Sequence, residues 1–155
     1  MKIVLLHGAS GNAATFEAVL PAWDDALALD LPGRGSSPGP ASDQVATTAA
    51  WLLTELDRRG LEAPLLVGHS YGGAVALQLA LDHPDRLGGL ALVSSASRLG
   101  VHPSILQAVA ASTSQAPYRL DAAFGPATDP DVIEAYARAS ALTPPATALA
   151  DWQAC

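Results

Sequence analysis

The sequence is poor in cysteine and in charged side chains. Cys155 is the only cysteine among 155 residues, which excludes an internal disulfide and a zinc site built from cysteines. Charged residues make up 15% of the chain and hydrophobic residues 50%, a balance typical of a packed globular domain rather than of a disordered chain. We therefore expect a globular protein of a reducing compartment, the cytoplasm.

Basic side chains are scarcer than acidic ones. The chain has 8 Lys and Arg residues against 15 Asp and Glu residues, a net charge of −7. Because such a chain repels phosphate groups and anionic lipids, we expect neither nucleic acid nor a membrane surface as a partner. The first apolar run is too short for a signal peptide, and no later run is long enough to cross a bilayer.

Short apolar runs alternate with helical patterns in the first part of the chain. The runs predict buried strands at residues 3–6, 26–29, 65–67 and 90–93. Apolar residues recur at helical spacing between them, at residues 15–23, 43–59 and 71–81. This alternation is typical of βαβ units, so we predict a doubly wound, mostly parallel sheet of about four strands with helices on both faces.

The strand pattern disappears after about Arg98. The remaining sequence is rich in alanine and is interrupted by prolines. Asp129-Pro130 and Thr143-Pro144 each place a capping side chain before a proline, which predicts two helix starts. We therefore expect two parts, a sheet-containing core at 1–98 and a helical lid at 99–155.

One motif carries most of the chemical information. Gly68-His69-Ser70-Tyr71-Gly72 has the spacing G-x-S-x-G and lies between a predicted strand and a predicted helix. A nucleophile at the tip of such a turn has a strained backbone, and Gly68 and Gly72 avoid the clashes that larger residues would cause. The motif predicts Ser70 as a nucleophile, with the N–H of Tyr71 at the positive end of a helix as a donor to an oxyanion. A glycine turn with an incidental serine is the simpler alternative.

Three further segments share the order of motifs of one family. Residues 7–11 read His-Gly-Ala-Ser-Gly after the first strand, residues 30–37 read Asp-Leu-Pro-Gly-Arg-Gly-Ser-Ser, and residues 81–87 read Leu-Asp-His-Pro-Asp-Arg-Leu. With the Ser70 turn, these segments resemble an α/β-hydrolase-fold serine hydrolase over nearly the whole chain. The resemblance implies a cofactor-free, metal-free enzyme in which the N–H groups of Ala9 and Tyr71 form the oxyanion hole.

The four histidines have structural alternatives to catalysis. The resemblance implies that His7 supports the oxyanion loop rather than acting as a base. His69 precedes Ser70, but successive side chains at a strand end point to opposite faces, so we expect it to pack or to hydrogen-bond nearby. His83 precedes a proline that ends a helix, and His102 opens the predicted lid, so both are expected at the surface.

Other polar residues near the motifs have alternative roles. Asp30 and Arg34 lie in the turn after the second strand, where a carboxylate can hold backbone N–H groups; Arg34 has the alternative of meeting an anionic substrate. Ser10 is expected to line the substrate pocket because it adjoins the oxyanion loop. Trp152 either packs within the lid or faces the pocket, and the sequence leaves both open.

The resemblance also implies two residues that are not found here. In this family the order along the chain is Ser, then an acid, then a histidine. The chain ends within a predicted lid helix before the strands that would carry the acid and the base, and its fourth strand lacks an outer neighbour. We expect a truncated, cleaved or split product, completed by a C-terminal hydrolase segment or a complementary chain.

The sequence therefore predicts a hydrolase that cleaves a carboxylic ester or a related acyl bond of a small molecule through an acyl-enzyme. The same fold also hosts lyases and perhydrolases, and it does not choose among them. The alternative from another class is a ligand-binding receptor, or an inactive fragment that pairs with a complementary chain.

Overall fold

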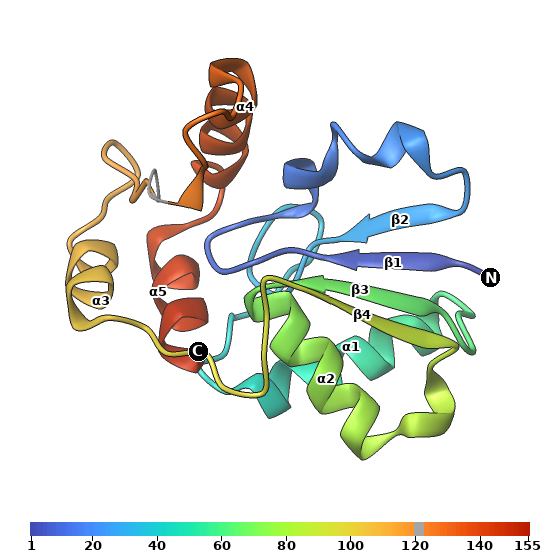
Figure 1. The fold of residues 1–155 in the computed structure, drawn as a ribbon. Coiled ribbons are helices and arrows are strands. Elements are labelled where there is room, and N and C mark those ends of the chain that lie inside the picture. The colour runs from blue at the N-terminus through green and yellow to red at the C-terminus, as the bar shows by residue number, and fades with distance from the viewer. Residues whose placement is uncertain (120–122) are drawn as a thin grey trace.

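A four-stranded parallel sheet is the centre of the protein in the computed structural model, which describes residues 1–119 and 123–155 (Figure 1). The strands are β1 (Ile3–Leu6), β2 (Ala26–Leu29), β3 (Leu65–His69) and β4 (Gly89–Val93). Their order across the sheet is β2-β1-β3-β4, and every neighbouring pair is parallel. The predicted strands and parallel sheet are confirmed, with ends that differ by at most two residues.

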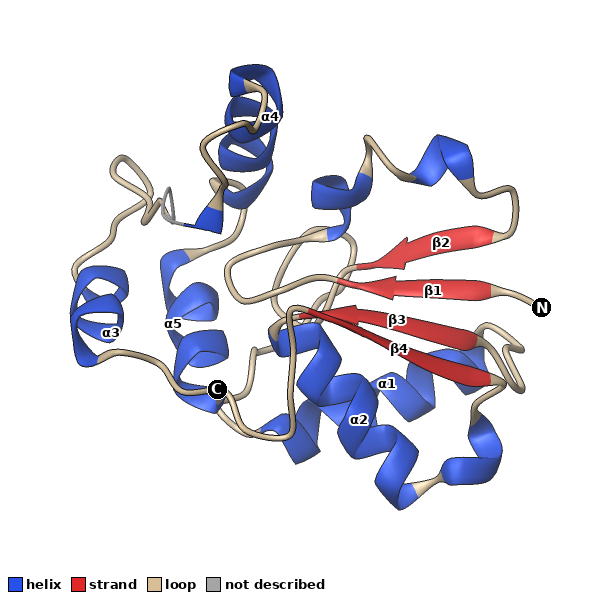
Figure 2. Ribbon diagram, in the orientation of Figure 1, coloured by secondary structure: helices blue, strands red, loops and turns tan. Residues whose placement is uncertain are grey.

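Two long helices, α1 (Val45–Arg58) and α2 (Tyr71–Asp82), pack against each other and cover one side of the sheet (Figure 2). Leu52 and Leu56 on α1 and Val75 on α2 have no exposed surface. They join four strand residues in one core: Val4, Leu6, Leu29 and Leu66. Burying an apolar stripe at helical spacing is what stabilises helices of this length.

The predicted helix at residues 15–23 is wrong. The segment forms two 3-10 turns instead, η1 (Ala13–Phe16) and η2 (Leu20–Ala22), which lie beside β2. Pro21 lacks the N–H that a continuous helix would need at that point. Neither turn buries a residue fully, so no core packing supports a longer helix.

Three more helices lie beyond the carboxyl ends of the strands (Figure 1): α3 (Pro103–Ala110), α4 (Pro130–Ser140) and α5 (Pro145–Ala154). Asp129 caps α4 as predicted, accepting a hydrogen bond from the N–H of Asp131. The predicted cap by Thr143 is wrong, because Pro144 is the N-cap of α5 and the Thr143 hydroxyl instead donates to the carbonyl of Gly11. The Thr143 side chain thus joins two segments that are distant in the sequence and does not cap the start of a helix.

The sheet edge at β4 is exposed. Leu92 and Val93 keep 39% and 46% of their surface accessible, whereas the side chains of the central strands are largely buried. Among the described residues, β4 has a strand neighbour on one side only, which is β3. The carboxyl end of β4 thus lies at the outside of the sheet.

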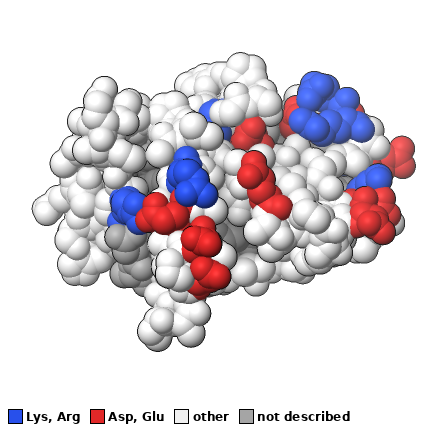
Figure 3. All heavy atoms as spheres, turned by 90° about the horizontal axis from the view of Figure 1, so that it is seen from above, with Lys and Arg blue, Asp and Glu red and all other residues white. Residues whose placement is uncertain are grey.

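Charges of both signs are mixed on the face seen from above in Figure 3, where Lys and Arg side chains lie next to Asp and Glu side chains. Lys2 with Asp25 and Arg119 with Glu134 are exposed ion pairs, and surface pairs of this kind contribute little stability. None of the helices formed by the described residues has the length and apolar character needed to cross a membrane.

Gly72 lets α2 approach β1, and this contact can be tested. A Cβ at Gly72 would lie 2.5 Å from the carbonyl oxygens of Leu6 and His7. We expect Gly72→Ala to lower the free energy of unfolding by about 1–3 kcal/mol, although alanine favours helix by about 1 kcal/mol. Gly100→Ala is the control, because a Cβ there meets nothing within 4 Å. Equal unfolding free energies for both variants in chemical denaturation would contradict this packing.

Candidate functional site

Ser70 occupies a strained turn between β3 and α2. Its φ is 50° and its ψ is −118°, a conformation that residues with a Cβ rarely adopt. The Ser70 N–H donates to the carbonyl of Val93 over 2.9 Å, and the Ser95 hydroxyl donates to the carbonyl of Ser70 over 2.7 Å. These bonds to the β4 end hold the strained residue, so the strand–turn–helix context that the G-x-S-x-G motif requires is present.

The flanking glycines are needed for close contact. A Cβ at Gly68 would lie 2.5 Å from the carbonyl oxygen of Gly72. A side chain at Gly68 would therefore press β3 and the first turn of α2 apart. The sequence-based explanation of these two glycines agrees with the geometry.

Ala9 lies close to Ser70 because β1 and β3 are neighbours, and Tyr71 directly follows Ser70 in the chain. Leu6 at the end of β1 pairs with Gly68 on β3, so the loop after β1 passes beside the Ser70 turn. Tyr71 is the first residue of α2, and its side chain points into the core, where its hydroxyl bonds to Thr48 over 2.9 Å. Among the described residues, no acceptor takes the backbone N–H of Ala9 or Tyr71.

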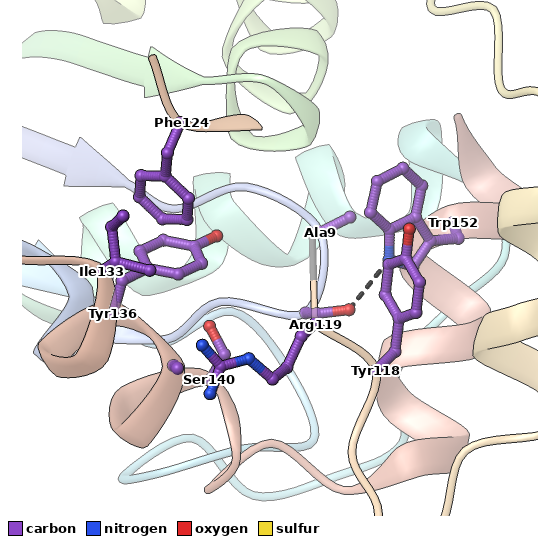
Figure 4. Close-up of a pocket in the computed structure, with 10 residues that line it drawn as sticks. Ala9, Tyr118, Arg119, Phe124, Ile133, Tyr136, Ser140 and Trp152 are labelled. Atoms are coloured by element: carbon purple, nitrogen blue, oxygen red, sulfur yellow. Dashed lines mark hydrogen bonds between the residues drawn. The ribbon is translucent and has the colours of Figure 1, made fainter. Parts of the chain in front are cut away.

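A cavity of about 510 Å³ opens above Ser70. Ala9 and Ser70 line it from the strand ends, and Phe124, Tyr136 and Trp152 line it from the α3–α5 region. A narrower pocket adjoins it and shares Ala9 and these three aromatic residues (Figure 4). A largely apolar space with few polar groups at its base is the usual form of a small-molecule site.

The aromatic residues around the narrower pocket form two edge-to-face pairs. Tyr118 lies 6.1 Å from Trp152, and Phe124 lies 5.5 Å from Tyr136, measured between ring centres. Figure 4 shows the first pair on one side of Ala9 and the second pair on the other. Trp152 thus faces the pocket, the second of the two roles that the sequence left open. Ser10 lines the narrower pocket, and its hydroxyl accepts a 2.8 Å hydrogen bond from Trp152 Nε1.

His7 is a structural residue with a defined tautomer. Its Nε2 accepts a hydrogen bond from the N–H of Leu31 over 3.1 Å, so the proton is on Nδ1, which donates to the carbonyl of Gly8 over 2.9 Å. Complete burial, with the nearby charge of Arg34, lowers the pKa of His7 to about 3. A neutral imidazole fixed by two backbone bonds supports the loop, which agrees with the role that the family resemblance implied.

The other histidines make no hydrogen bond to the Ser70 hydroxyl, although His69 lines the same cavity. The ring of His69 packs against Gly8, where a Cβ would lie 2.9 Å from its Nδ1, and burial lowers its pKa. His83 and His102 are exposed, and His102 accepts a hydrogen bond from the N–H of Ser104 at the start of α3. Within residues 1–119 and 123–155, no side chain hydrogen-bonds to the Ser70 hydroxyl, and no three metal-binding side chains gather in one place.

Asp30 organises the loops around it, as predicted. Its carboxylate accepts hydrogen bonds from the N–H groups of Ala13 and Ser36, each over 2.8 Å, and from the Ser36 hydroxyl. Burial opposes ionisation of Asp30, but these donors outweigh it and hold the pKa of its carboxyl below the usual value. Gly35 has no space for a side chain, because a Cβ there would meet the same carboxylate.

Arg34 binds Asp151, a contact that sequence reasoning missed. Its two terminal nitrogens donate to the two carboxylate oxygens of Asp151, both over 2.6 Å, and both side chains are 1% exposed. Burial raises the pKa of Asp151, and the Arg34 guanidinium and the Ser10 N–H offset that rise only in part. The ion pair leaves Arg34 unavailable to an anionic substrate. The one clue in the sequence is that Asp151 is the single charged residue of its helix.

A family model described as alpha/beta hydrolase fold matches residues 2–152 of the chain. The chain belongs to the α/β hydrolase fold family. An enol-lactonase structure from Burkholderia xenovorans LB400 superposes on 98% of the chain and 63% of its own length with a TM-score of 0.81, at 22% identity, which supports the fold of this family member.

Two curated relatives are similar to part of this α/β hydrolase fold protein. One is the dihydrolipoyllysine-residue acetyltransferase component of an acetoin cleaving system from Cupriavidus necator, which is 43% identical over 59% of the chain and 26% of its own length. The other is a pimeloyl-[acyl-carrier protein] methyl ester esterase from Aeromonas hydrophila, 41% identical over 60% of the chain and 37% of its own length. The chain therefore spans well under half of these relatives.

The lowered pKa of His7 predicts how stability depends on pH. The unfolded chain binds a proton at His7 below pH 6.5, and the folded protein binds it only near pH 3. The contribution of His7 to the free energy of unfolding is therefore fully present above pH 6.5. It is lost as the pH drops, by up to about 1.4 kcal/mol per pH unit. We expect His7→Gln, which keeps an acceptor for Leu31, to remove the His7 part of this dependence between pH 6.5 and 4.5 and to leave the part that comes from the lowered pKa of His69.

The control for this measurement is His102→Gln, at an exposed position. Chemical denaturation at several pH values gives the slope for each protein. If the free energy of unfolding had the same pH slope in wild type and in His7→Gln within this window, His7 would not be a buried neutral imidazole in the folded protein.

Proposed function

We propose that this α/β hydrolase is a serine hydrolase that cleaves a carboxylic ester or a related acyl bond. The observation that carries the proposal is Ser70, held in a strained turn at the base of the cavity beside two backbone N–H groups without an acceptor. Strain of this kind persists where the surrounding structure holds it, and it is frequent at active sites. The Aeromonas relative is named for a methyl ester substrate, which supports the same bond type.

The reaction follows from the position of these groups. Ser70 Oγ attacks the carbonyl carbon and gives its proton to a base, while the carbonyl oxygen becomes an oxyanion that accepts hydrogen bonds from Ala9 N–H and Tyr71 N–H. Collapse of the tetrahedral intermediate expels the alcohol, which takes the proton from the base, and leaves an acyl group on Ser70. Water then hydrolyses this acyl-enzyme in the same two steps.

The base and its orienting acid come, in this proposal, from the remainder of the protein. Among the described residues no histidine hydrogen-bonds to the Ser70 hydroxyl, and the relatives are longer than the chain. The exposed end of β4 is the surface that we propose this remainder covers, because Leu92 and Val93 are exposed beside the Ser70 turn. We place the reaction in the cytoplasm, since the sequence holds one cysteine and no disulfide.

The substrate is proposed to be a small molecule with an apolar group. The region from α3 to α5, in the role of a lid, contributes aromatic side chains to the cavity, and apolar contact with these favours an uncharged acyl or alcohol part. The base of the cavity supplies the reacting serine and the oxyanion donors. Chemistry and substrate preference are thus assigned to different parts of the chain.

A non-catalytic ligand receptor is the alternative. It is favoured by the absence, among the described residues, of a base that contacts Ser70. A receptor would bind its ligand in the same cavity without attack by Ser70. Replacement of the hydroxyl therefore separates the two functions.

We expect Ser70→Ala in the full-length protein to lower kcat for a p-nitrophenyl ester by about 10⁴-fold or more, and to abolish labelling by a fluorophosphonate probe. The reason is that alanine cannot form the acyl-enzyme. Ser97→Ala, at an exposed serine outside the cavity, is the matched control and should label normally. If the probe did not label Ser70 in folded wild-type protein, the assignment of Ser70 as the nucleophile would be wrong.

Leu92 tests whether the β4 edge is covered in the full-length protein. There we expect Leu92→Lys to lower the free energy of unfolding by about 2 kcal/mol or more, because the substitution would bury a charge. Leu142→Lys is the control, since Leu142 is 73% exposed and belongs to no strand. Similar small effects of both substitutions, measured by chemical denaturation, would show that β4 stays uncovered.

A further inference from the structure

The loop that carries Ala9 is held by α5 and by the segment before it. The Ser10 N–H donates to Asp151 Oδ2 over 3.0 Å, and Trp152 Nε1 donates to the Ser10 hydroxyl over 2.8 Å. The next residue of the loop, Gly11, accepts hydrogen bonds at its carbonyl from Arg34 Nη1 and from the Thr143 hydroxyl. Residues about 130–140 positions apart in the sequence therefore fix the backbone beside Ser70.

The conformation of this loop needs external support. The N–H of Gly11 donates to the carbonyl of Gly8 over 3.0 Å, which closes a four-residue turn with Ala9 and Ser10 at its centre. Ser10 has a φ of 62°, and Ala9 has no positive φ, which is the pattern of a type II turn. The third position of such a turn favours glycine, so a serine there costs free energy that its contacts must offset.

The contact with Asp151 selects this turn over the commoner one. Type I and type II turns differ mainly by rotation of the central peptide plane, here the one between Ala9 and Ser10. The N–H of Ser10 belongs to that plane and points at a carboxylate. Rotation would replace the N–H by the Ala9 carbonyl oxygen and set it against the negative charge of Asp151. Only the type II form keeps the hydrogen bond.

Arg34 makes Asp151 suited to this role. Its two short hydrogen bonds fix the carboxylate plane and favour the ionised form, and one carboxylate oxygen then accepts the Ser10 N–H as well. The Arg34 Nη2 also donates to the carbonyl of Pro32, so the guanidinium is anchored to its own loop. The carboxylate is thereby held in place for the turn.

We propose that Asp151, oriented by Arg34, is a positioning residue that anchors the Gly8–Gly11 turn at its Ser10 N–H and thereby holds the Ala9 N–H, which lies on the preceding peptide of the same turn, toward the oxyanion hole. This inference rests on the proposed function. It connects α5 to the rate of acyl transfer rather than to substrate binding. Oxyanion donors act on the transition state, so their misplacement lowers kcat and leaves KM nearly unchanged.

Two double variants of the full-length protein separate this role from the ion pair itself. R34M/D151N and R34M/D151L both remove the two buried charges, and asparagine and leucine have similar size. Asparagine keeps an oxygen that can accept the Ser10 N–H, whereas leucine has none. Replacing both members of a buried ion pair is tolerated far better than removing one, so both variants are expected to fold.

We expect kcat for a p-nitrophenyl ester to be about 10–100-fold lower in R34M/D151L than in R34M/D151N, with KM within about threefold. Ser10→Gly added to R34M/D151L should restore part of kcat, because glycine adopts the positive φ without the hydrogen bond. Equal kcat values in the two double variants would overturn the proposal. A wild-type protein that neither turns over the ester nor labels at Ser70 would instead overturn the proposed function, and this inference with it.

Hydrogen exchange of the Ser10 amide gives a second test that needs no activity. In wild type and R34M/D151N we expect this amide to exchange at least about tenfold more slowly than in R34M/D151L. Fast exchange of the Ser10 amide in the wild-type protein, measured by NMR, would overturn the proposal even if neither double variant folded.

Discussion

The buried ion pair between Arg34 and Asp151 is the interaction on which the arrangement around the site depends. It joins the turn after β2 to α5, and both partners also bond to the loop after β1. Burying two charges costs free energy. The short bidentate hydrogen bonds offset much of this cost, but the pair is not a large source of stability. The pair matters because it fixes geometry. Another position of α5 would separate the two side chains and leave an unpaired charge in the core, so such positions are disfavoured.

The core of the sheet was predictable from the sequence because its signals are local. Four apolar runs, glycine turns and the G-x-S-x-G spacing each lie within about ten residues, and each forms the element expected. The failures occur where a distant partner decides. Residues 13–23 lack a core to pack on and stay in 3-10 turns, and Thr143 bonds to Gly11 rather than capping its own helix.

The difference between local signals and distant partners applies to the site as well. Ser70 and its flanking glycines were recognisable, because strain and close approach restrict which residues fit at adjacent positions. Asp151 was not, since its partner lies 117 positions away and the pairing depends on how α5 meets the sheet. His7 is intermediate: the family resemblance implied support of the loop, but its tautomer follows from the two backbone groups it meets.

The cavity combines parts of different origin. Its base is formed by the ends of β1 and β3, whose positions follow from sheet register and allow little movement. Its wall is formed by aromatic side chains of α4, α5 and the loop between α3 and α4, a region that touches the base through a few polar bonds. Substitutions in the wall can therefore change the shape of the pocket without moving Ser70, except at Asp151 and Trp152. These two neighbours bond to Ser10, so at this point a change in the wall reaches the backbone beside the nucleophile.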